Sequence, residues 1–220
     1  MKEESDTLAG MHRALLSLVY LTLLTSFTAA APKPQNVLIG SDQRARDLIR
    51  LLELHVLPKE SGYLGIIGVS AQKVMVNGRS LAVQSQNYYM LTRDRPINFL
   101  HWLQPDDTHI LIEGGPVDYF IFYPDGRAEK LTLGMNLRAG QRPVIAVPGG
   151  SWKALRLHDG VAYALTANTL SPEFTPYRVK IGAGEDWVKR YTGAAPWATP
   201  KFLRELIGPN WISSGSSPSR

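Results

Sequence analysis

The sequence predicts an all-β fold with a few short helices, arranged as a sandwich or a barrel, and two observations support this. Short apolar segments with alternation near period two recur between Gly65 and Lys180, as in half-buried strands. Turn-forming pairs such as Asn77-Gly78 and Asp159-Gly160 separate them. About ten short strands at this spacing are typical of a sandwich or barrel. The expected strands span residues 65–70, 80–92, 98–103, 109–112, 117–123, 130–133, 143–147, 152–157, 162–169 and 177–180.

Helices are expected at the two ends of this strand region. Leucines at helical spacing predict an amphipathic helix over residues 43–54, with Ser41-Asp42 as the N-cap and Pro58 beyond its end. Towards the C-terminus, residues 187–191 and 200–206 have helical patterns. The tail over residues 213–220 is poor in apolar residues, so we expect it to be disordered.

The N-terminal region resembles a secretory signal peptide. An uncharged apolar run covers residues 14–27, with Arg13 before it and small residues after it, which indicates cleavage near Ala30. The run is shorter than the roughly 20 apolar residues of a transmembrane span. We therefore expect residues 1–30 to be removed and the protein to be secreted or to reside in the secretory pathway, with no stable membrane association afterwards. An uncleaved membrane anchor and a start at Met11 are the alternatives.

The composition excludes several functional classes. The chain contains no cysteine, which excludes disulfides, thiolate metal ligands and a cysteine nucleophile. Its net charge of +5 is spread along the sequence without a run of Lys and Arg, so no nucleic-acid partner is expected. The sequence has no G-x-S-x-G, phosphate-loop or H-E-x-x-H motif, and hydrolase, nucleotide-binding and zincin chemistry therefore lack support.

Several short motifs follow one another along residues 48–191. Residues 58–63 (PKESGY) keep the Glu, Gly and Tyr of an HPEGG-Tyr motif, and residues 87–91 (NYYML) are similar to an aromatic strand. Residues 133–143, with Leu-Gly at their start, and residues 148–154 (PGGSWKA) and 171–174 (SPEF) continue the series. In this order the motifs resemble the branch of the cupin superfamily called cupin family five.

The resemblance implies a cupin double-stranded β-helix, or jelly roll, over residues 48–191. A lead-in over residues 31–47 would precede this domain, and an extension over residues 192–212 would follow it. Such a barrel encloses an interior of ligand size, where a small organic molecule would bind. Many cupins pair through their N-terminal strands, so the resemblance also implies a homodimer.

The ligands of metal-binding cupins are only partly present in this chain. Aligned on the family pattern, His101 takes the place of the first histidine and Asp107 that of the glutamate. His109 falls one residue before the second histidine position, and a one-residue offset in a strand reverses the face. We therefore expect His109 to point away from the side that His101 faces, unless a bulge re-registers the strand. The position of the third histidine is Lys153, whose ammonium cannot bind a metal. No metal or other cofactor is expected.

A pocket without metal is the preferred interpretation. His101 with Asp107 would form an acid/base pair in which the carboxylate orients the imidazole, provided that the chain turns at Gln104-Pro105. Aromatic walls are expected from Tyr63, Tyr89 and Trp152, and polar ligand contacts from Glu60, His109 and Lys153.

Three functions remain open at this stage. The first is a metal-independent isomerase, epimerase, cyclase or dehydratase that uses His101 as general acid or base. The second is a non-catalytic binding or scaffolding cupin, which the eroded HPEGG motif and the missing second histidine favour. The third is a degenerate metallo-oxygenase, which requires His109 to face inward.

Overall fold

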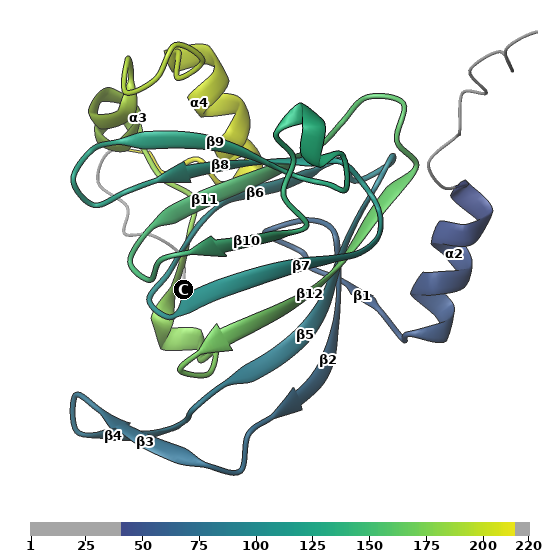
Figure 1. Ribbon diagram of the computed structural model, residues 1–220. Helices are drawn as coiled ribbons and strands as arrows, with labels where there is room; N and C mark the ends of the chain where they lie inside the picture. The colour runs from purple at the N-terminus through teal and green to yellow at the C-terminus, as the bar shows by residue number, and fades with distance from the viewer. Residues whose placement is uncertain (1–40, 214–220) are drawn as a thin grey trace, which may run out of the picture. The chain divides into compact units, whose positions relative to one another are not determined.

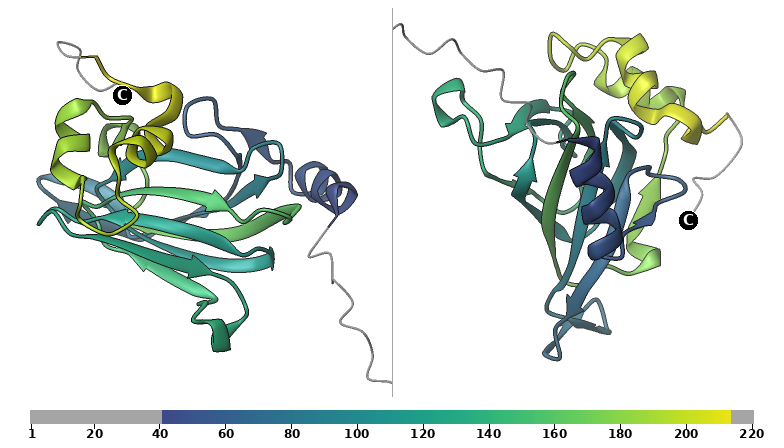
Figure 2. Two further views of the ribbon diagram at one scale, coloured as in Figure 1. Left: turned by 90° about the horizontal axis from the view of Figure 1, so that it is seen from above. Right: turned by 90° about the vertical axis from the view of Figure 1, so that its right-hand side faces the viewer.

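The computed structural model describes residues 41–213. Within this range a six-stranded sheet faces a five-stranded sheet, and a two-stranded hairpin extends away from both (Figure 1). The views from above and from the side show the two sheets stacked on each other (Figure 2). The expected signal peptide, the lead-in up to Gly40 and the tail beyond Ser213 lie outside the described residues. Among the helices in the described part of the chain, none is long and apolar enough to cross a membrane.

The two sheets are antiparallel throughout and form the expected jelly roll. In spatial order the larger sheet contains β1 (His55–Val56), β2 (Tyr63–Val69), β5 (Ser85–Thr92), β12 (Tyr163–Ser171), β7 (Asp106–Gly114) and β10 (Val144–Val147). The smaller sheet contains β13 (Val179–Ile181), β6 (Ile97–Leu103), β11 (Trp152–Leu157), β8 (Val117–Phe122) and β9 (Ala128–Leu133). The hairpin consists of β3 (Lys73–Val76) and β4 (Arg79–Ala82).

The helices are short and lie outside the sheets. They are α2 (Asp42–Leu51), α3 (Glu185–Tyr191) and α4 (Pro200–Ile207), together with the 3-10 turns η1 (Leu137–Ala139), η2 (Pro176–Arg178) and η3 (Gly208–Asn210). The expected N-cap is confirmed, because Ser41 Oγ accepts a hydrogen bond from Arg44 N. The helix ends earlier than predicted, because Glu53 adopts a φ of +52° that does not continue a helix.

Alternation along β8 separates two layers of the core. Tyr119 and Ile121 face the interior between the sheets, whereas Phe120 and Phe122 face the C-terminal helices. The helices α3 and α4 thus cover the outer face of the five-stranded sheet (Figure 1). The C-terminal extension is therefore packed against the domain by apolar contacts.

Most strand predictions agree with the structure, and the main exception is the segment 80–92. It divides into β4 and β5, and β4 pairs with β3, a strand that the pattern did not predict. Asn77 and Gly78 both have positive φ, at +50° and +76°, and join β3 to β4 as the expected two-residue turn.

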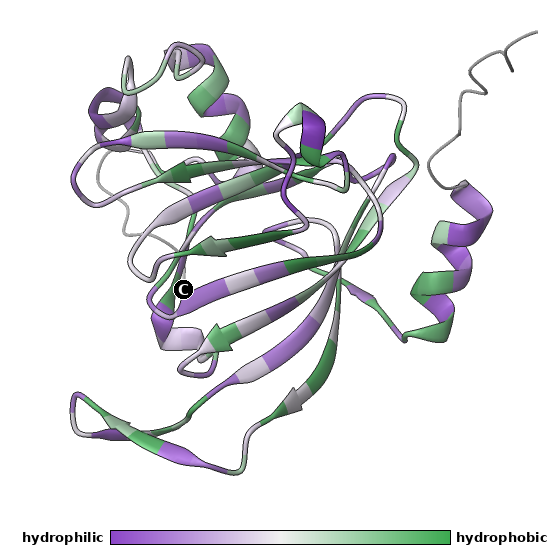
Figure 3. Cartoon of the chain, in the orientation of Figure 1, coloured by the Kyte–Doolittle hydropathy of each residue, from purple (hydrophilic) through white to green (hydrophobic). Residues whose placement is uncertain are grey.

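Strand β7 divides into a polar half and an apolar half. Its first residues, from Asp106 to His109, are hydrophilic, and the residues from Ile110 to Ile112 are hydrophobic (Figure 3). The polar half lies next to β10 and β12. It therefore places ionisable side chains at one end of the space between the sheets.

Candidate functional site

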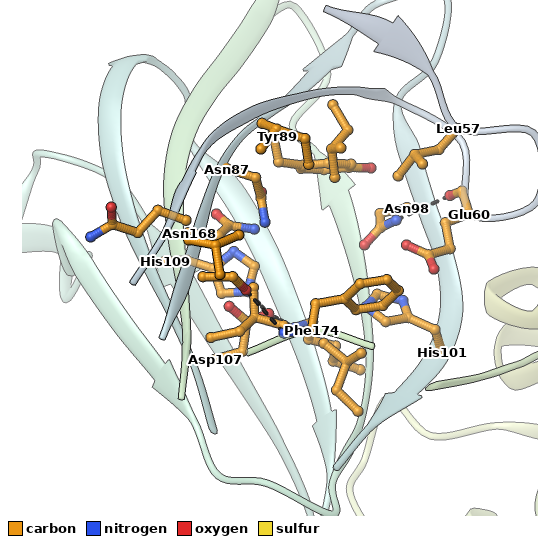
Figure 4. A pocket seen from close by; sticks show the side chains of 18 of the residues that line it. Leu57, Glu60, Asn87, Tyr89, Asn98, His101, Asp107, His109, Asn168 and Phe174 are labelled. Atoms are coloured by element: carbon orange, nitrogen blue, oxygen red, sulfur yellow. Dashed lines mark hydrogen bonds and ion pairs between the residues drawn. The ribbon is translucent and has the colours of Figure 1, made fainter. Parts of the chain in front are cut away.

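A cavity of about 240 Å³ lies between the two sheets, beside the polar half of β7. Polar side chains line it in two groups: Glu60, Asn98 and His101 lie on one side, and Asn87, Asp107, His109 and Asn168 on the other (Figure 4). The apolar part of its wall includes Leu57, Leu64, Ile66, Leu103, Leu170 and Phe174. Apolar walls with a few converging polar groups are typical of small-molecule sites.

Asp107 and His109 both face this cavity. They lie two residues apart on β7 and pair in continuous register with Val147 and Ile145 of β10, so strand alternation places both on the inner face. The expectation that His109 points away from the side that His101 faces is therefore wrong. No bulge is needed, because the turn between β6 and β7 allows His101, Asp107 and His109 to share one cavity.

Lys153 reaches this group from the opposite sheet. It lies on β11, directly across from His101 on β6, and its Nζ contacts Asp107 Oδ2. The same carboxylate oxygen lies 2.9 Å from His109 Nε2. Asp107 thus joins a lysine and a histidine from two facing sheets, and all three side chains are buried.

The protonation states of this group follow from its contacts. Burial favours the neutral form of Asp107, but the contacts with His109 and Lys153 outweigh it and hold the pKa of this carboxyl well below its usual range. Burial lowers the pKa of His109, and the nearby Lys153 lowers it further, against the opposing effect of Asp107. At neutral pH the group therefore consists of an ionised carboxylate, a neutral imidazole and a lysine.

His101 is anchored to the backbone and does not pair with Asp107. Its Nδ1 lies 2.9 Å from the carbonyl oxygen of Phe99, which can only accept a hydrogen bond, so Nδ1 carries the proton. Burial, with a further contribution from Lys153, lowers the pKa of His101 to about 3. Asp107 therefore contacts His109 and Lys153 rather than His101, which corrects the expected acid/base pair.

Of the two carboxyl groups that line the cavity, Glu60 has the raised pKa. Burial raises its pKa to about 7, and the charge of Asp107 adds to this while Lys153 opposes it. Its backbone oxygen accepts hydrogen bonds from Phe99 N at 2.8 Å and from Asn98 Nδ2 at 3.1 Å. The loop that carries Glu60 is thereby fixed to β6, with the side chain beside the cavity (Figure 4).

Of the three expected aromatic walls, only Tyr89 lines the cavity. Its hydroxyl donates to the carbonyl oxygen of Ser61 at 2.9 Å, and a Cβ on Gly62, whose φ is +77°, would clash with that hydroxyl. This close approach requires glycine in the PKESGY segment. Tyr63 and Trp152 are placed elsewhere: Tyr63 packs near α2, and Trp152 packs beside Trp187 under the C-terminal helices. Each neighbours a residue that lines the cavity, so alternation turns it to the other face.

The sequence pattern missed a row of polar side chains that contains two amides, called here the row of amides. Asn87, Asn168 and His109 are register partners across β5, β12 and β7, and all three face the cavity (Figure 4). Thr166 Oγ1 donates to Asn168 Oδ1 at 2.9 Å, whereas Asn87 Oδ1 has no hydrogen-bond partner among the described residues. The sequence did contain a signal for these two residues. Asparagine is depleted in strands, and both Asn87 and Asn168 lie within segments predicted as strands.

The side chains around the cavity do not fit a divalent metal. Two imidazoles and two carboxylates are donors that such ions accept. Among residues 41–213, however, no three His, Asp or Glu side chains are grouped so that they could hold a metal ion. The ammonium of Lys153 also contacts the Asp107 oxygen that a metal would need. The inward orientation of His109 therefore does not restore the metal site on which the metallo-oxygenase hypothesis depends.

A family model and a curated relative are similar to this chain in sequence. The family model described as "Cupin superfamily (DUF985)" matches residues 46–181. The "Uncharacterized protein YML079W" of Saccharomyces cerevisiae is 31% identical over 119 residues, which cover 53% of this chain. The match spans 59% of the length of that yeast protein.

Solved structures with similar folds come from other organisms. A hypothetical protein from Leishmania major has a TM-score of 0.62 at 23% identity, and the match covers 74% of this chain and 97% of that one. Protein SO0799 from Shewanella oneidensis has a TM-score of 0.63 at 23% identity, with 74% and 96% covered. At this identity the two structures support the fold and nothing finer.

Proposed function

Because the chain belongs to the cupin superfamily, we propose that its cavity binds a small organic molecule and transfers a proton to or from it without a tightly held metal. The reaction class is isomerisation, epimerisation, cyclisation or dehydration. One observation carries the proposal: Glu60, a carboxyl group with a pKa near 7, lies beside the same cavity as the Lys153–Asp107 pair. A general acid or base works best when its pKa is close to the working pH.

Glu60 takes the role that the sequence suggested for His101. An imidazole with a pKa of about 3 stays neutral at physiological pH, and its Nδ1 proton is held by the Phe99 carbonyl oxygen. His101 still leaves Nε2 as an acceptor for a ligand hydroxyl. In the proposed reaction it binds, and Glu60 exchanges the proton.

The proton transfer needs no other reactant. The Glu60 carboxylate accepts a proton from a carbon next to a carbonyl group of the ligand. The electron pair left on that carbon forms a double bond to the carbonyl carbon, and the π pair of the carbonyl moves onto its oxygen, which gives an enolate. The Glu60 carboxylic acid then returns the proton to another atom of the ligand, which completes an isomerisation. Polar groups that are already oriented where the charge develops lower the barrier of such a step.

Deuterium exchange tests the proposal before the product is known. Small hydroxy, oxo and polyhydroxy compounds are screened by the increase in Tm that they cause, and the compounds that bind are incubated with the enzyme in D₂O. Proton NMR should show loss of a C–H signal with the wild-type protein. Glu60→Gln should retain binding and lose exchange. Exchange that continues unchanged in this variant would show that the assignment to Glu60 is wrong.

A non-catalytic binding protein is the second candidate. The departure of PKESGY from the HPEGG-Tyr pattern favours it. The same experiment separates the two, because a binding protein raises its Tm with a ligand and exchanges no deuterium into it.

Secretion is a separate part of the proposal and rests on the sequence of residues 1–30. Expression of the full chain with a C-terminal tag, followed by N-terminal sequencing of the secreted product, tests it. A mature protein that begins near Ala31 is the expected outcome. Retention of the full-length chain in the membrane fraction would favour the anchor instead.

A further inference from the structure

Lys153 lies among the ionisable groups that line the cavity. Its ammonium contacts Asp107 on the opposite sheet, and its backbone pairs with His101 on the same sheet. His109 shares the Asp107 oxygen with Lys153. The charge of Lys153 also influences the pKa of Glu60. One cation is thus close to two histidines and two carboxyl groups.

The ammonium has hydrogen-bonding capacity beyond its contact with Asp107. A lysine ammonium has three N–H donors, and within residues 41–213 the acceptor found for Nζ is Asp107 Oδ2. Lys153 is 2% exposed and lines the cavity. Its remaining N–H groups are therefore available to a molecule inside the cavity.

A cation at this position also compensates the negative charge of the Asp107 carboxylate. Asp107 is buried, and a buried carboxylate requires a cation or several hydrogen bonds to remain ionised. Its second oxygen, Oδ1, has no hydrogen-bond partner among the described residues. A divalent ion could meet the same need, but it would compete with the ammonium for the same carboxylate.

We infer that the Lys153 ammonium occupies the place in this cavity that a divalent metal would require, and that it binds a carboxylate or carbonyl oxygen of the bound molecule. The second part deepens the proposed function and rests on it. In the proposed reaction, negative charge develops on this oxygen. The first part concerns the protein alone and is tested without any substrate.

Cobalt(II) is a suitable probe for the first part, because its visible absorption reports imidazole and carboxylate ligands. The untagged full chain is expected to bind no Co²⁺ in the cavity. Lys153→His removes the ammonium and adds an imidazole next to His101 and Asp107, and it should gain one equivalent of Co²⁺. Lys153→Met removes the charge without adding a ligand and is the matched control. The double variant Lys153→His/His109→Gln should lose most of the gain.

Two results would overturn this part. One is a folded Lys153→His variant that binds no more Co²⁺ than the wild type. The other result does not depend on the folding of a Lys153 variant. It is the binding of one equivalent of Co²⁺ by the wild-type protein together with the absence of this binding in His109→Gln.

Acetate is the probe for the oxygen contact. In protein labelled with ¹⁵N-lysine, the Nζ signal that is missing in Lys153→Met belongs to Lys153. Acetate should shift this signal saturably in the wild type. In Lys153→Met, acetate binding is followed by the increase in Tm and should be at least tenfold weaker than in the wild type. A signal that does not move up to saturating acetate would overturn the oxygen contact. Neither probe depends on turnover, so a failure here is distinguishable from an absence of deuterium exchange.

Discussion

Lys153 of β11 and Asp107 of β7 form an ion pair across the two sheets, and both side chains are almost completely buried, at 2% and 4% exposure. Burying two charges costs several kcal/mol for each ion, which their mutual attraction offsets only with close geometry. A pair of apolar side chains of similar volume would often be as stable. We interpret the pair as a feature of the site rather than as a device that stabilises the fold.

The first prediction concerns the stability of single and double variants of this pair. Lys153→Met leaves an uncompensated buried carboxylate, and Asp107→Asn leaves an uncompensated ammonium, so each should lower the free energy of unfolding by about 3 to 5 kcal/mol. The double variant Lys153→Met/Asp107→Asn should lie within about 1 kcal/mol of the wild type. Urea unfolding measures all four proteins. Additive losses in the double variant would contradict the interpretation.

The second prediction concerns Glu60 and the pH dependence of stability. Its pKa is about 7 in the folded protein, against an ordinary value of 4.5, so between these values the folded state binds more protons than the unfolded state. Stability from this group is complete below about pH 4.5 and is lost as the pH rises towards 7, by up to about 3 kcal/mol. In urea unfolding, Glu60→Gln should therefore gain stability relative to the wild type as the pH rises.

An exposed glutamate provides the control for this experiment. Glu205 is exposed on α4, and Glu205→Gln removes the same type of carboxylate as Glu60→Gln. If Glu60→Gln and Glu205→Gln show the same stability profile against pH, Glu60 has no raised pKa.

The third prediction concerns His101 and acid. Its pKa falls from 6.5 to about 3 on folding, so its contribution to stability is complete above pH 6.5 and is lost as the pH falls towards 3. Near pH 4.5 the loss amounts to about 2 to 3 kcal/mol. His101→Asn keeps an N–H for the Phe99 carbonyl and cannot be protonated. It should therefore lose less stability than the wild type between pH 7 and pH 4.5, with the exposed His55→Asn as control.

The fold was predictable largely because each sheet produces a local pattern of apolar and polar residues in the sequence. Alternation located most strands, and the Asn77-Gly78 turn and the Ser41 cap followed from residue types with specific backbone roles. The hairpin strand β3 was missed because three of its four residues are exposed, so burial imposes no strict alternation on it. The end of α2 was misplaced because the leucines continue beyond the turn at Glu53.

The site was less predictable than the fold because its contacts join distant segments. Alternation within β7 could have placed Asp107 and His109 on one face, and alignment to a family pattern obscured this. The contact between Lys153 and Asp107 depends on how two sheets face each other, which no local pattern contains. The pKa of Glu60 depends on burial by that same packing. Residue types therefore identified most ionisable members of the site, but not how they pair.

The fourth prediction concerns assembly. Beyond Leu64, the outer edge of β2 has no partner strand within the described chain, and Ile66 on this strand lines the cavity while 74% exposed. Met75 on the projecting hairpin is exposed as well. Apolar edge strands usually pair or are covered, so we predict a homodimer in which a second copy covers this area. Light scattering on a sizing column should give twice the chain mass. Ile67 follows Ile66 on β2, is 44% exposed and is not among the residues that line the cavity, so Ile67→Glu/Met75→Glu should give monomers. A wild-type monomer at micromolar concentration would contradict this.

The fifth prediction uses the row of amides to separate stability from binding. Asn87 is buried within β5, and its Oδ1 has no hydrogen-bond partner among the described residues, which costs about 1 to 3 kcal/mol. Asn87→Leu keeps the branching of the side chain at Cγ and removes the unpaired group, so it should raise the free energy of unfolding by about 1 kcal/mol. If the row binds the ligand, the same variant should lose the increase in Tm that a bound compound causes in the wild type. Asn136→Leu, at the exposed N-cap of η1, is the control and should leave ligand binding unchanged. A variant that is both less stable and fully able to bind would show that Asn87 serves the fold instead of the cavity.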